Sequence, residues 1–347
     1  MQRLWYSFLR VYVRIGLHIY FRKISIHGLQ NIPEGPVIFA ANHQNSFMDA
    51  LLIVCFNTHI THFLTRADIF RRPFFNWLLS TLNMIPVYRI RDGWQLLAEN
   101  QKTFEACNQV FLKNETVVIF PEGNHDARRR LRPLSKGFTK VAFDSLLKNP
   151  DLKISIVPVG LNYTDHQAYG GSVSIIFGES ILANDYFNNP SQNGSPRLRN
   201  ELEARMKRII THVEDADRYP EIIRKLEFNN PDYLDPFETN KMIAAIEKGD
   251  VATASSAARQ PKKSGMGKLL YLLSWVINFI PLLIWIVLKI NIKDPVFVPS
   301  LKFGVGIFLF PVFYLLMAVG FYWSLGLPAA IGWLVLAFIS LLFLKRP

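Results

Sequence analysis

A histidine and an aspartate six residues apart are the pair in this sequence best suited to catalysis. His43 and Asp49 belong to the string ANHQNSFMD, which occupies residues 41–49. A histidine titrates near neutrality and can therefore take a proton from a weakly acidic hydroxyl. A carboxylate at its other ring nitrogen would set the tautomer and stabilise the imidazolium that forms. The alternative is that both residues serve only as parts of a loop and a helix cap.

This string follows a predicted buried strand and leads into a predicted helix. Ser46 and Asp49 have the spacing of a capping box, which predicts Ser46 as the N-cap and Asp49 in the first helical turn. On one continuous helix, His43 and Asp49 would point about 240° apart. We therefore expect His43 to lie in the turn before the helix, where the chain can fold back onto the carboxylate.

A second polar string, IFPEGNH at residues 119–125, also follows a predicted strand. Its Pro-Glu-Gly segment would end the strand and expose backbone amides beside the arginine-rich residues 128–132. Lys136 then begins a predicted helix, whose N-terminal amides favour an anion. The pattern indicates a site for an anionic group, although an arginine run can equally mark a solvated face. Two further strings are MIPVYRIR at residues 84–91 and IVPVGLN at residues 156–162.

In this order, the four strings resemble those of the glycerophospholipid acyltransferase family, which includes glycerol-3-phosphate and lysophosphatidate acyltransferases. The resemblance covers about residues 24–178. It implies that His43 is the catalytic base and that Asp49 is its carboxylate partner. It also implies that acyl-CoA or an acyl carrier protein thioester supplies the acyl chain to a glycerol-phosphate-type acceptor, with no metal and no bound cofactor.

The resemblance extends to the residues expected to bind the acceptor. Arg89 matches the arginine that ends the second block, and Glu122 and Gly123 match the third. The usual Thr-Arg after that block is replaced by Asn124 and His125, so an arginine further along the chain would complete the phosphate site. The expected substrate-binding residues are Asn42, Arg89, Glu122, Gly123, Asn124, Arg128, Arg130 and Lys136.

One departure from the family pattern lies between His43 and Asp49. Five residues separate them, whereas the common spacing is four. The distance from Ser46 to Asp49 is the usual one, so the extra residue is expected in the turn. Some eukaryote-like glycerol-3-phosphate or dihydroxyacetone-phosphate acyltransferases are similar to this longer form. This similarity slightly favours a first acylation of the acceptor over the acylation of lysophosphatidate.

Short β-type runs alternate with helical patterns between residues 24 and 182. This alternation predicts an α/β domain whose sheet is covered by helices. The resemblance implies that the sheet is of the glycerolipid-acyltransferase type. The predicted strands are 24–26, 37–40, 62–65, 85–88, 116–119, 154–160 and 173–177, and the predicted helices are 48–56, 73–82, 94–112 and 136–148. A further helix with one apolar stripe is predicted to start after Ser195.

Residues on either side of this domain have the composition of membrane-binding segments. An amphipathic helix is predicted near the N-terminus, basic and aromatic without any acidic residue, as is typical of the membrane interface; packing on the domain is the alternative. A membrane hairpin is predicted for residues 303–323 and 327–344, because neither run contains a charged residue. The segment 269–288 is expected to be re-entrant or interfacial, and together with the hairpin it makes up a hydrophobic helical module.

The chain therefore divides into four parts. We expect an interfacial amphipathic helix at residues 1–23, an acyltransferase domain at 24–245, a linker at 246–265 and a membrane module at 266–347. Arginines at positions 3, 10 and 14 argue against a signal peptide. Cys55 and Cys107 lie in apolar stretches and are expected in the core of a cytosol-facing domain. The expected location is a membrane, taken as a bacterial inner membrane, with the catalytic domain on the cytosolic face.

The formal net charge of +12 suits anionic lipid head groups or phosphorylated substrates. Nucleic acid would be attracted equally by charge, but the membrane segments favour lipid, so no nucleic-acid partner is expected. His59 and His62 are spaced like a ligand pair but lack further ligands, so no metal site is expected there. The remaining alternatives are an acyltransferase for a non-glycerol lyso-lipid and a catalytically inactive membrane scaffold.

Overall fold

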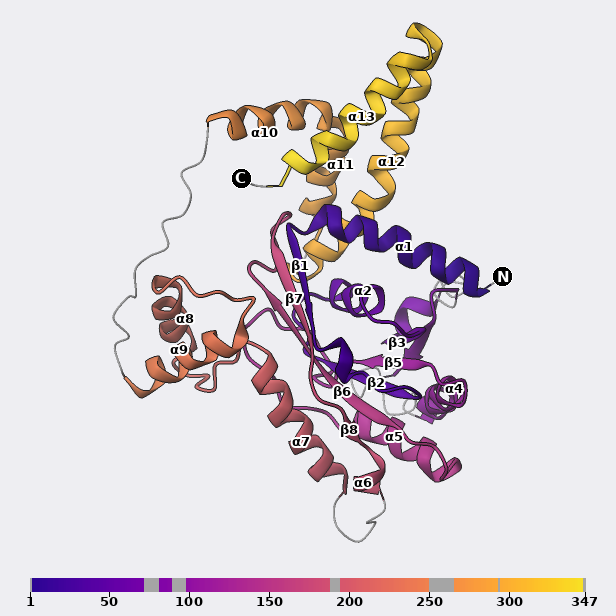
Figure 1. Cartoon of the computed structure of the whole chain (residues 1–347), viewed down its shortest axis with the longest axis vertical. Coiled ribbons are helices and arrows are strands. Elements are labelled where there is room, and N and C mark those ends of the chain that lie inside the picture. The colour runs from indigo at the N-terminus through magenta and orange to yellow at the C-terminus, as the bar shows by residue number, and fades with distance from the viewer. Residues whose placement is uncertain are drawn as a thin grey trace.

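The centre of the molecule is one twisted sheet. The computed structural model describes residues 2–71, 81–88, 98–187, 194–249, 265–292 and 294–345 (Figure 1). The strands are β1 (Lys23–His27), β2 (Val37–Ala41), β3 (Thr61–Arg66), β4 (Met84–Val87), β5 (Thr116–Ile119), β6 (Ser155–Tyr163), β7 (Ser172–Phe177) and β8 (Ile181–Leu182). They form an eight-stranded sheet of order β1-β7-β6-β2-β5-β3-β4, with β8 paired to β6. β6 pairs antiparallel with β7 and β8, and the other pairs are parallel.

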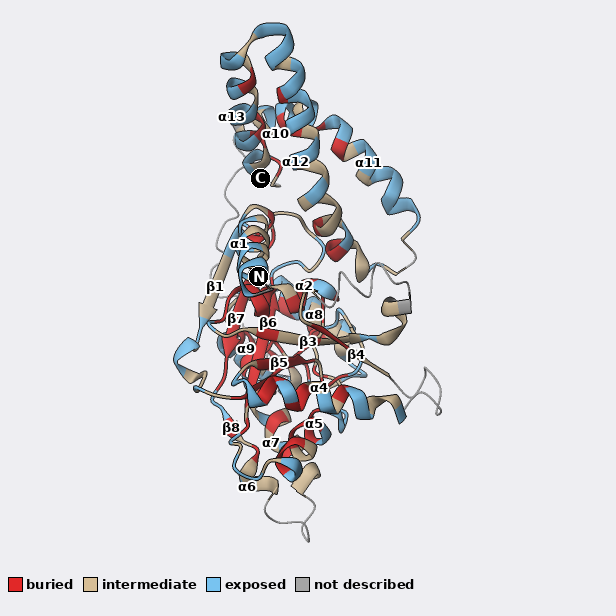
Figure 2. Cartoon of the chain, turned by 90° about the vertical axis from the view of Figure 1, so that its right-hand side faces the viewer, coloured by how far each residue is buried: buried red, intermediate tan, exposed pale blue. Residues whose placement is uncertain are grey.

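Helices cover both faces of this sheet. They are α1 (Gln2–Tyr20), α2 (Phe47–Cys55), α4 (Asn100–Leu112), α5 (Gly137–Lys148), α6 (Asn184–Phe187), α7 (Gly194–Ile209), α8 (Tyr219–Phe228) and α9 (Pro236–Lys248), with short 3-10 helices η1 (Leu29–Asn31) and η2 (Ala67–Arg71). On β2, Phe39 packs on the side of α1 and α2, whereas Ile38 packs on the side of α4, α5 and α7. Every residue of β2 is therefore buried, as expected for a central parallel strand. Buried residues are concentrated in the middle of the sheet, around β6 and β7 (Figure 2).

The predicted α/β architecture is confirmed, with shifts at several ends. The predicted strand 154–160 continues to Tyr163, and the short strand β8 was not predicted. The helix predicted at 94–112 is described from Asn100 onwards. Most of the predicted helix 73–82 lies outside the described residues. Cys55 and Cys107 are both buried, in agreement with their predicted place in the core.

Four helices form the C-terminal module, and they are α10 (Gly265–Ile277), α11 (Phe279–Ile290), α12 (Phe297–Leu325) and α13 (Leu327–Phe343). Within the described part of the chain, α12 alone is a single helix long and apolar enough to cross a membrane. The α10–α11 pair bends by 81°. The predicted break near Asn278 and Pro281 thus falls at Asn278, between the two helices.

Polar side chains satisfy the break inside the apolar module. The Asn278 amide donates to the Ser274 carbonyl and to the Ser340 hydroxyl, each at 2.8 Å. The Tyr314 hydroxyl donates to the amide oxygen of Asn278 at 2.5 Å. Exposed polar groups are costly in an apolar environment, so this network explains how a bent helix pair is stable in an apolar module.

The module folds back onto the α/β domain. α12 extends away from this domain and α13 returns towards it (Figure 1). The Lys345 ammonium donates to the carbonyls of His18 at 3.0 Å and Phe21 at 2.8 Å. This return supports the predicted hairpin with both ends on one side, although the placement of a membrane stays a prediction.

Candidate active site

The two main polar strings meet because their strands are neighbours. β2 and β5 run parallel, and Ala40 pairs with Ile119, so the chain leaves both strands at the same edge of the sheet. Ligands of open α/β sheets bind outside this carboxyl edge. His43 follows β2 and Glu122 follows β5, and the His43 amide donates to the Glu122 carboxylate at 2.9 Å. Parallel pairing thus joins strings that are far apart in the sequence.

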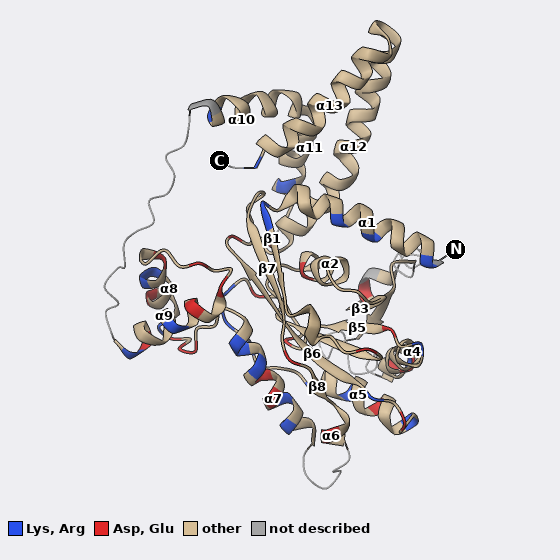
Figure 3. Ribbon diagram, in the orientation of Figure 1, with Lys and Arg blue, Asp and Glu red and all other residues tan. Residues whose placement is uncertain are grey.

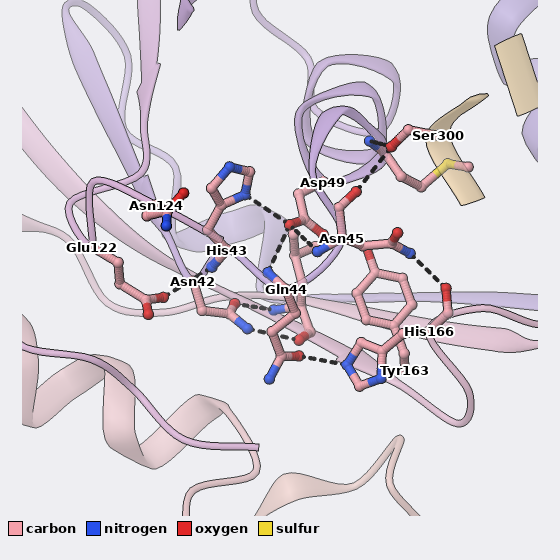
Figure 4. Close-up of polar contacts among 12 residues, drawn as sticks. Asn42, His43, Gln44, Asn45, Asp49, Glu122, Asn124, Tyr163, His166 and Ser300 are labelled. Atoms are coloured by element: carbon pink, nitrogen blue, oxygen red, sulfur yellow. Dashed lines mark hydrogen bonds and ion pairs between the residues drawn. The ribbon is translucent and has the colours of Figure 1, made fainter. Parts of the chain in front are cut away.

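Asp49 is fully buried and receives four hydrogen bonds. The Nδ1 atom of His43 lies 3.0 Å from its Oδ2 atom, as predicted, and the amides of Gln44 and Asn45 donate to the same oxygen at 2.9 and 2.7 Å (Figure 4). The Tyr163 hydroxyl donates to Oδ1 at 2.5 Å. These bonds satisfy both oxygens of a carboxylate that is shielded from water.

The predicted capping box is wrong in one respect. Ser46 is the N-cap of α2, but its side chain makes no capping hydrogen bond and its φ is +47°. Asp49 instead folds back onto the amides of Gln44 and Asn45. A positive φ is unfavourable for a residue with a side chain, so the surrounding hydrogen bonds must hold the turn. We attribute this shape to the extra residue between His43 and Asp49.

The ring of His43 is fixed on two sides. It stacks on Phe120 with 4.0 Å between ring centroids, while Nδ1 faces Asp49. In the neutral tautomer that donates from Nδ1 to the Asp49 carboxylate, the lone pair is on Nε2. No described residue is hydrogen-bonded to Nε2, and the side chain is 18% exposed. His43 can therefore act as a base towards a group that approaches from solvent.

Glu122 holds the backbone of the turn that carries His43. Its second carboxylate oxygen accepts from the Arg132 amide at 3.1 Å. Burial raises the pKa of Glu122 to about 7, although hydrogen bonds from the amides of His43 and Arg132 oppose this rise. The next residue, Gly123, has a φ of +69°, which favours glycine at this turn. Both residues thus shape the site, and any direct contact with an acceptor stays a prediction.

Two other predicted substrate-binding residues already have protein partners. The Asn42 side chain is buried and exchanges two hydrogen bonds with the backbone of Leu161, at 3.0 and 2.8 Å, so it joins β2 to β6. The exposed Arg128 guanidinium pairs with the Asp126 carboxylate at 2.6 Å, which partly neutralises its charge. These contacts do not test whether either residue binds substrate.

The remaining predicted residues lie around the turn after β5 or outside the described residues. The carbonyl of Asn124 accepts from the Arg132 guanidinium at 3.4 Å. Lys136 is exposed and caps α5, whose start is held near this turn by a hydrogen bond between the Ser135 amide and the Pro121 carbonyl. Arg130 is half-buried, and Arg89 lies outside the described residues.

Several residues that support the turn were not predicted. Tyr163 binds Asp49 from the end of β6. Gln44 donates to the Arg128 carbonyl at 2.8 Å and pairs with His166 at 3.1 Å. Burial and the Arg129 charge lower the pKa of His166 to about 4, so the neutral ring donates to Gln44. Only Tyr163 had a signal in the sequence, because it ends the strand that begins in the fourth string.

Ser300 links the C-terminal module to the turn at residues 42–48, here named the catalytic turn because it carries the predicted base His43. Its hydroxyl accepts from the Met48 amide and donates to the Asn45 carbonyl, both at 3.1 Å. Nearby, the His125 ring lies 5.8 Å from His43 and packs edge-on against Phe297 of α12. Burial and the His43 charge lower the pKa of His125. Residues of α12 therefore form part of the surroundings of the site.

Most amides of the catalytic turn are occupied. Those of His43, Gln44, Asn45 and Met48 all donate to protein oxygens. These four amides are therefore not free to donate to an oxyanion that forms during acyl transfer. Among the described residues, no group of three or more His, Cys, Asp or Glu is arranged to hold a metal ion. His62, one of the spaced histidines, pairs with Glu115 at 2.7 Å.

Comparison with known proteins finds a family model and several relatives that match part of this chain. Residues 23–162 match the family model described as Acyltransferase. The chloroplastic 1-acyl-sn-glycerol-3-phosphate acyltransferase LPAT1 of Arabidopsis thaliana is 28% identical over 45% of this chain and 40% of its own length. The 1-acyl-sn-glycerol-3-phosphate acyltransferase of Pseudomonas aeruginosa is 23% identical over 55% of this chain and 68% of its own. The chain thus spans about two fifths of the plant relative.

A solved structure also matches part of this chain. The crystal structure of the 1-acyl-sn-glycerophosphate acyltransferase of Thermotoga maritima has 18% sequence identity to this chain and a TM-score of 0.44. The match covers 60% of this chain and 78% of that one.

Proposed function

We propose that this chain, a member of the acyltransferase family through residues 23–162, transfers a fatty-acyl group from a thioester to a hydroxyl of a glycerol-phosphate-type acceptor. The donor is acyl-CoA or an acyl carrier protein thioester. The observation that carries the proposal is the contact of His43 Nδ1 with the buried Asp49, which leaves Nε2 open at the carboxyl edge of the sheet. The similarity to 1-acyl-sn-glycerol-3-phosphate acyltransferases supports the substrate class.

In the proposed reaction, Nε2 of His43 takes the proton of the acceptor hydroxyl while its oxygen attacks the thioester carbonyl. Asp49 stabilises the positive charge that develops on the ring. The carbon–sulfur bond then breaks, and the proton passes from His43 to the departing thiolate. Tyr163 and the amides of Gln44 and Asn45 keep the Asp49 carboxylate in place throughout.

We propose that the acceptor phosphate lies near the turn after β5. The start of α5, with Lys136, borders this turn, and helix N-termini favour anions. The strand before Arg89 ends at the same edge of the sheet, because Val87 pairs with Arg66 in parallel register. These placements support Arg89 and Lys136 as phosphate ligands. Asn124, Arg128 and Arg130 follow from the same turn and complete the proposed set.

We propose that the protein binds a membrane through α1 and the C-terminal module. One face of α1 exposes large apolar side chains, which are Leu4, Trp5, Phe8, Val11 and Ile15. The α12–α13 hairpin is covered by exposed apolar residues and carries basic residues near its base (Figure 3). By the positive-inside rule, the catalytic domain then lies on the cytosolic face. In a cysteine-free background, an impermeant thiol reagent should label a cysteine at position 325, and not one at position 346, from outside.

A direct test measures transfer of labelled acyl groups by the purified full chain. The acceptors are glycerol 3-phosphate, dihydroxyacetone phosphate, lysophosphatidate and a non-glycerol lyso-lipid, each with acyl-CoA and acyl carrier protein donors. We expect transfer to at least one glycerol-phosphate acceptor and its loss in His43→Ala, but not in His27→Ala, whose side chain is exposed on β1. Transfer only to the non-glycerol lipid, or to none, would contradict the proposal.

A further inference from the structure

An apolar cavity of about 560 Å³ lies between the catalytic domain and the C-terminal module. Its walls come from α1, the four C-terminal helices and the loop of residues 165–169. This volume is typical of sites for small molecules. The residues that line it include neither His43 nor Asp49, so the cavity is separate from the proposed reacting centre.

The cavity is charged at one end and apolar at the other. Lys289 near the end of α11 and Lys302 near the start of α12 both line it, on either side of the short connection between these helices. Eight residues away from each lysine, the lining residues are Pro281 on α11 and Phe310 on α12. At the rise of an α-helix, eight residues correspond to about 12 Å. The lining thus changes from basic to apolar along both helices.

The change from basic to apolar residues matches a phospholipid in one leaflet, whose charged head group is followed by its hydrocarbon chains. Asp165 is the acidic residue of the lining, and the two lysines outnumber it, so the charged residues of the lining are mostly basic. Lys302 also lies 5.7 Å from the Tyr169 ring centre. A phosphate near the lysines would place a hydrocarbon chain against the apolar part of the cavity. Anionic lipid head groups are attracted to basic residues at the membrane surface.

We propose that this cavity binds one acyl chain of an anionic membrane phospholipid, with its phosphate beside Lys289 and Lys302. Because neither proposed catalytic residue lines the cavity, the occupant is a leaflet lipid and not the reacting acceptor. The lipid contacts the same segments that hold the catalytic turn, since Ser300 lies between the lining residues Val298 and Lys302. Its binding depends on the proposed membrane association but not on acyl transfer.

A pair of glycines in α12 offers matched variants. A Cβ atom at Gly304 or at Gly306 would meet nothing within 4 Å, so both positions accept a larger side chain. Only Gly306 lines the cavity. Leucine at position 306 would therefore occupy the space of the lipid chain, whereas Gly304→Leu controls for the change in helix propensity and in surface apolarity.

The test uses the full chain in phosphatidylcholine nanodiscs that contain phosphatidylglycerol with a photoreactive group on its chain. We expect cross-links to residues of α11 and α12 that line the cavity. Gly306→Leu should reduce them roughly fivefold, which corresponds to about 1 kcal/mol, and Gly304→Leu should not. Lys289→Gln should weaken the preference over a photoreactive phosphatidylcholine, whereas Lys268→Gln, on the exposed surface of α10, should leave it unchanged.

Three results would overturn the proposal. The first is equal cross-linking in the two glycine variants, and the second is equal cross-linking of the anionic and zwitterionic probes in the wild type. The third is displacement of the probe by the acceptor at the concentration that half-saturates transfer, because the cavity would then belong to the acceptor site. If Gly306→Leu failed to fold, the comparison of the lysine variants and of the two probes would still decide.

Discussion

Replacing Asp49 by asparagine removes a charge from the site while keeping the shape of the side chain. The asparagine carbonyl can occupy the place of Oδ2 and keep the hydrogen bonds from His43, Gln44 and Asn45. Its amide then faces Tyr163, whose hydroxyl can turn and accept. Because all four partners remain satisfied, we expect the free energy of unfolding to change by only about 1 kcal/mol.

Catalysis should suffer far more than stability. The imidazolium formed during proton transfer would lose its ionic partner at 3.0 Å. If the amide instead faced His43, it would stabilise the tautomer that has its lone pair on Nδ1 and so block Nε2 as a base. General-base catalysis contributes about 10²–10⁴-fold to rates, so we expect kcat to fall by that factor, which equals about 3–5 kcal/mol.

Asp49→Ala provides the contrast, because it leaves four buried donors without an acceptor. Each unsatisfied group costs about 1–3 kcal/mol, so this variant should lose stability as well as activity. The assay combines kcat for acyl transfer with the thermal midpoint of the full chain in nanodiscs. If Asp49→Asn kept more than about a tenth of wild-type kcat, Asp49 would not support a general base. If its midpoint fell as far as that of Asp49→Ala, its role would be structural.

Three further predictions concern Glu122, Ser300 and Arg89. The pKa of Glu122 rises from 4.5 to about 7 on folding. Its contribution to the free energy of unfolding, about 3 kcal/mol, is therefore present below pH 4.5 and lost as pH rises through 7. Across this pH range, the melting temperature of Glu122→Gln should fall less than that of the wild type. Ser300→Ala removes two hydrogen bonds to the catalytic turn and should lower kcat about 5–10-fold, with little change in the KM of either substrate. Ser300→Thr keeps the hydroxyl and should recover kcat. An equal loss of kcat in both variants would contradict a positioning role. Arg89→Ala should raise the KM of the acceptor by a factor that corresponds to about 1.5–3 kcal/mol and leave the KM of the thioester nearly unchanged; equal effects on both substrates would indicate a structural arginine.

Local patterns in the sequence were sufficient to predict the α/β architecture and the central pair. The run of apolar residues in β2 indicates a strand covered on both faces, and the polar turn after it indicates the carboxyl edge. The contact between His43 and Asp49 was also predictable, because only six residues separate them and a turn is the one geometry that lets them meet. The break at Asn278 followed from the interruption of an otherwise apolar segment.

Only the tertiary structure shows what holds this pair in place. Tyr163 reaches Asp49 because β6 lies beside β2, with Ala41 paired to Val159, and the order of strands is not encoded in any local pattern. Ser300 reaches the catalytic turn because a helix 255 residues from Asn45 docks there. The predicted capping bond is absent because Asp49 instead accepts from the amides of Gln44 and Asn45, in a turn whose Asn45 and Met48 backbone is also bound by Ser300. Short-range hydrophobic periodicity determines the elements, whereas hydrogen bonds between segments distant in sequence form only once the elements have packed.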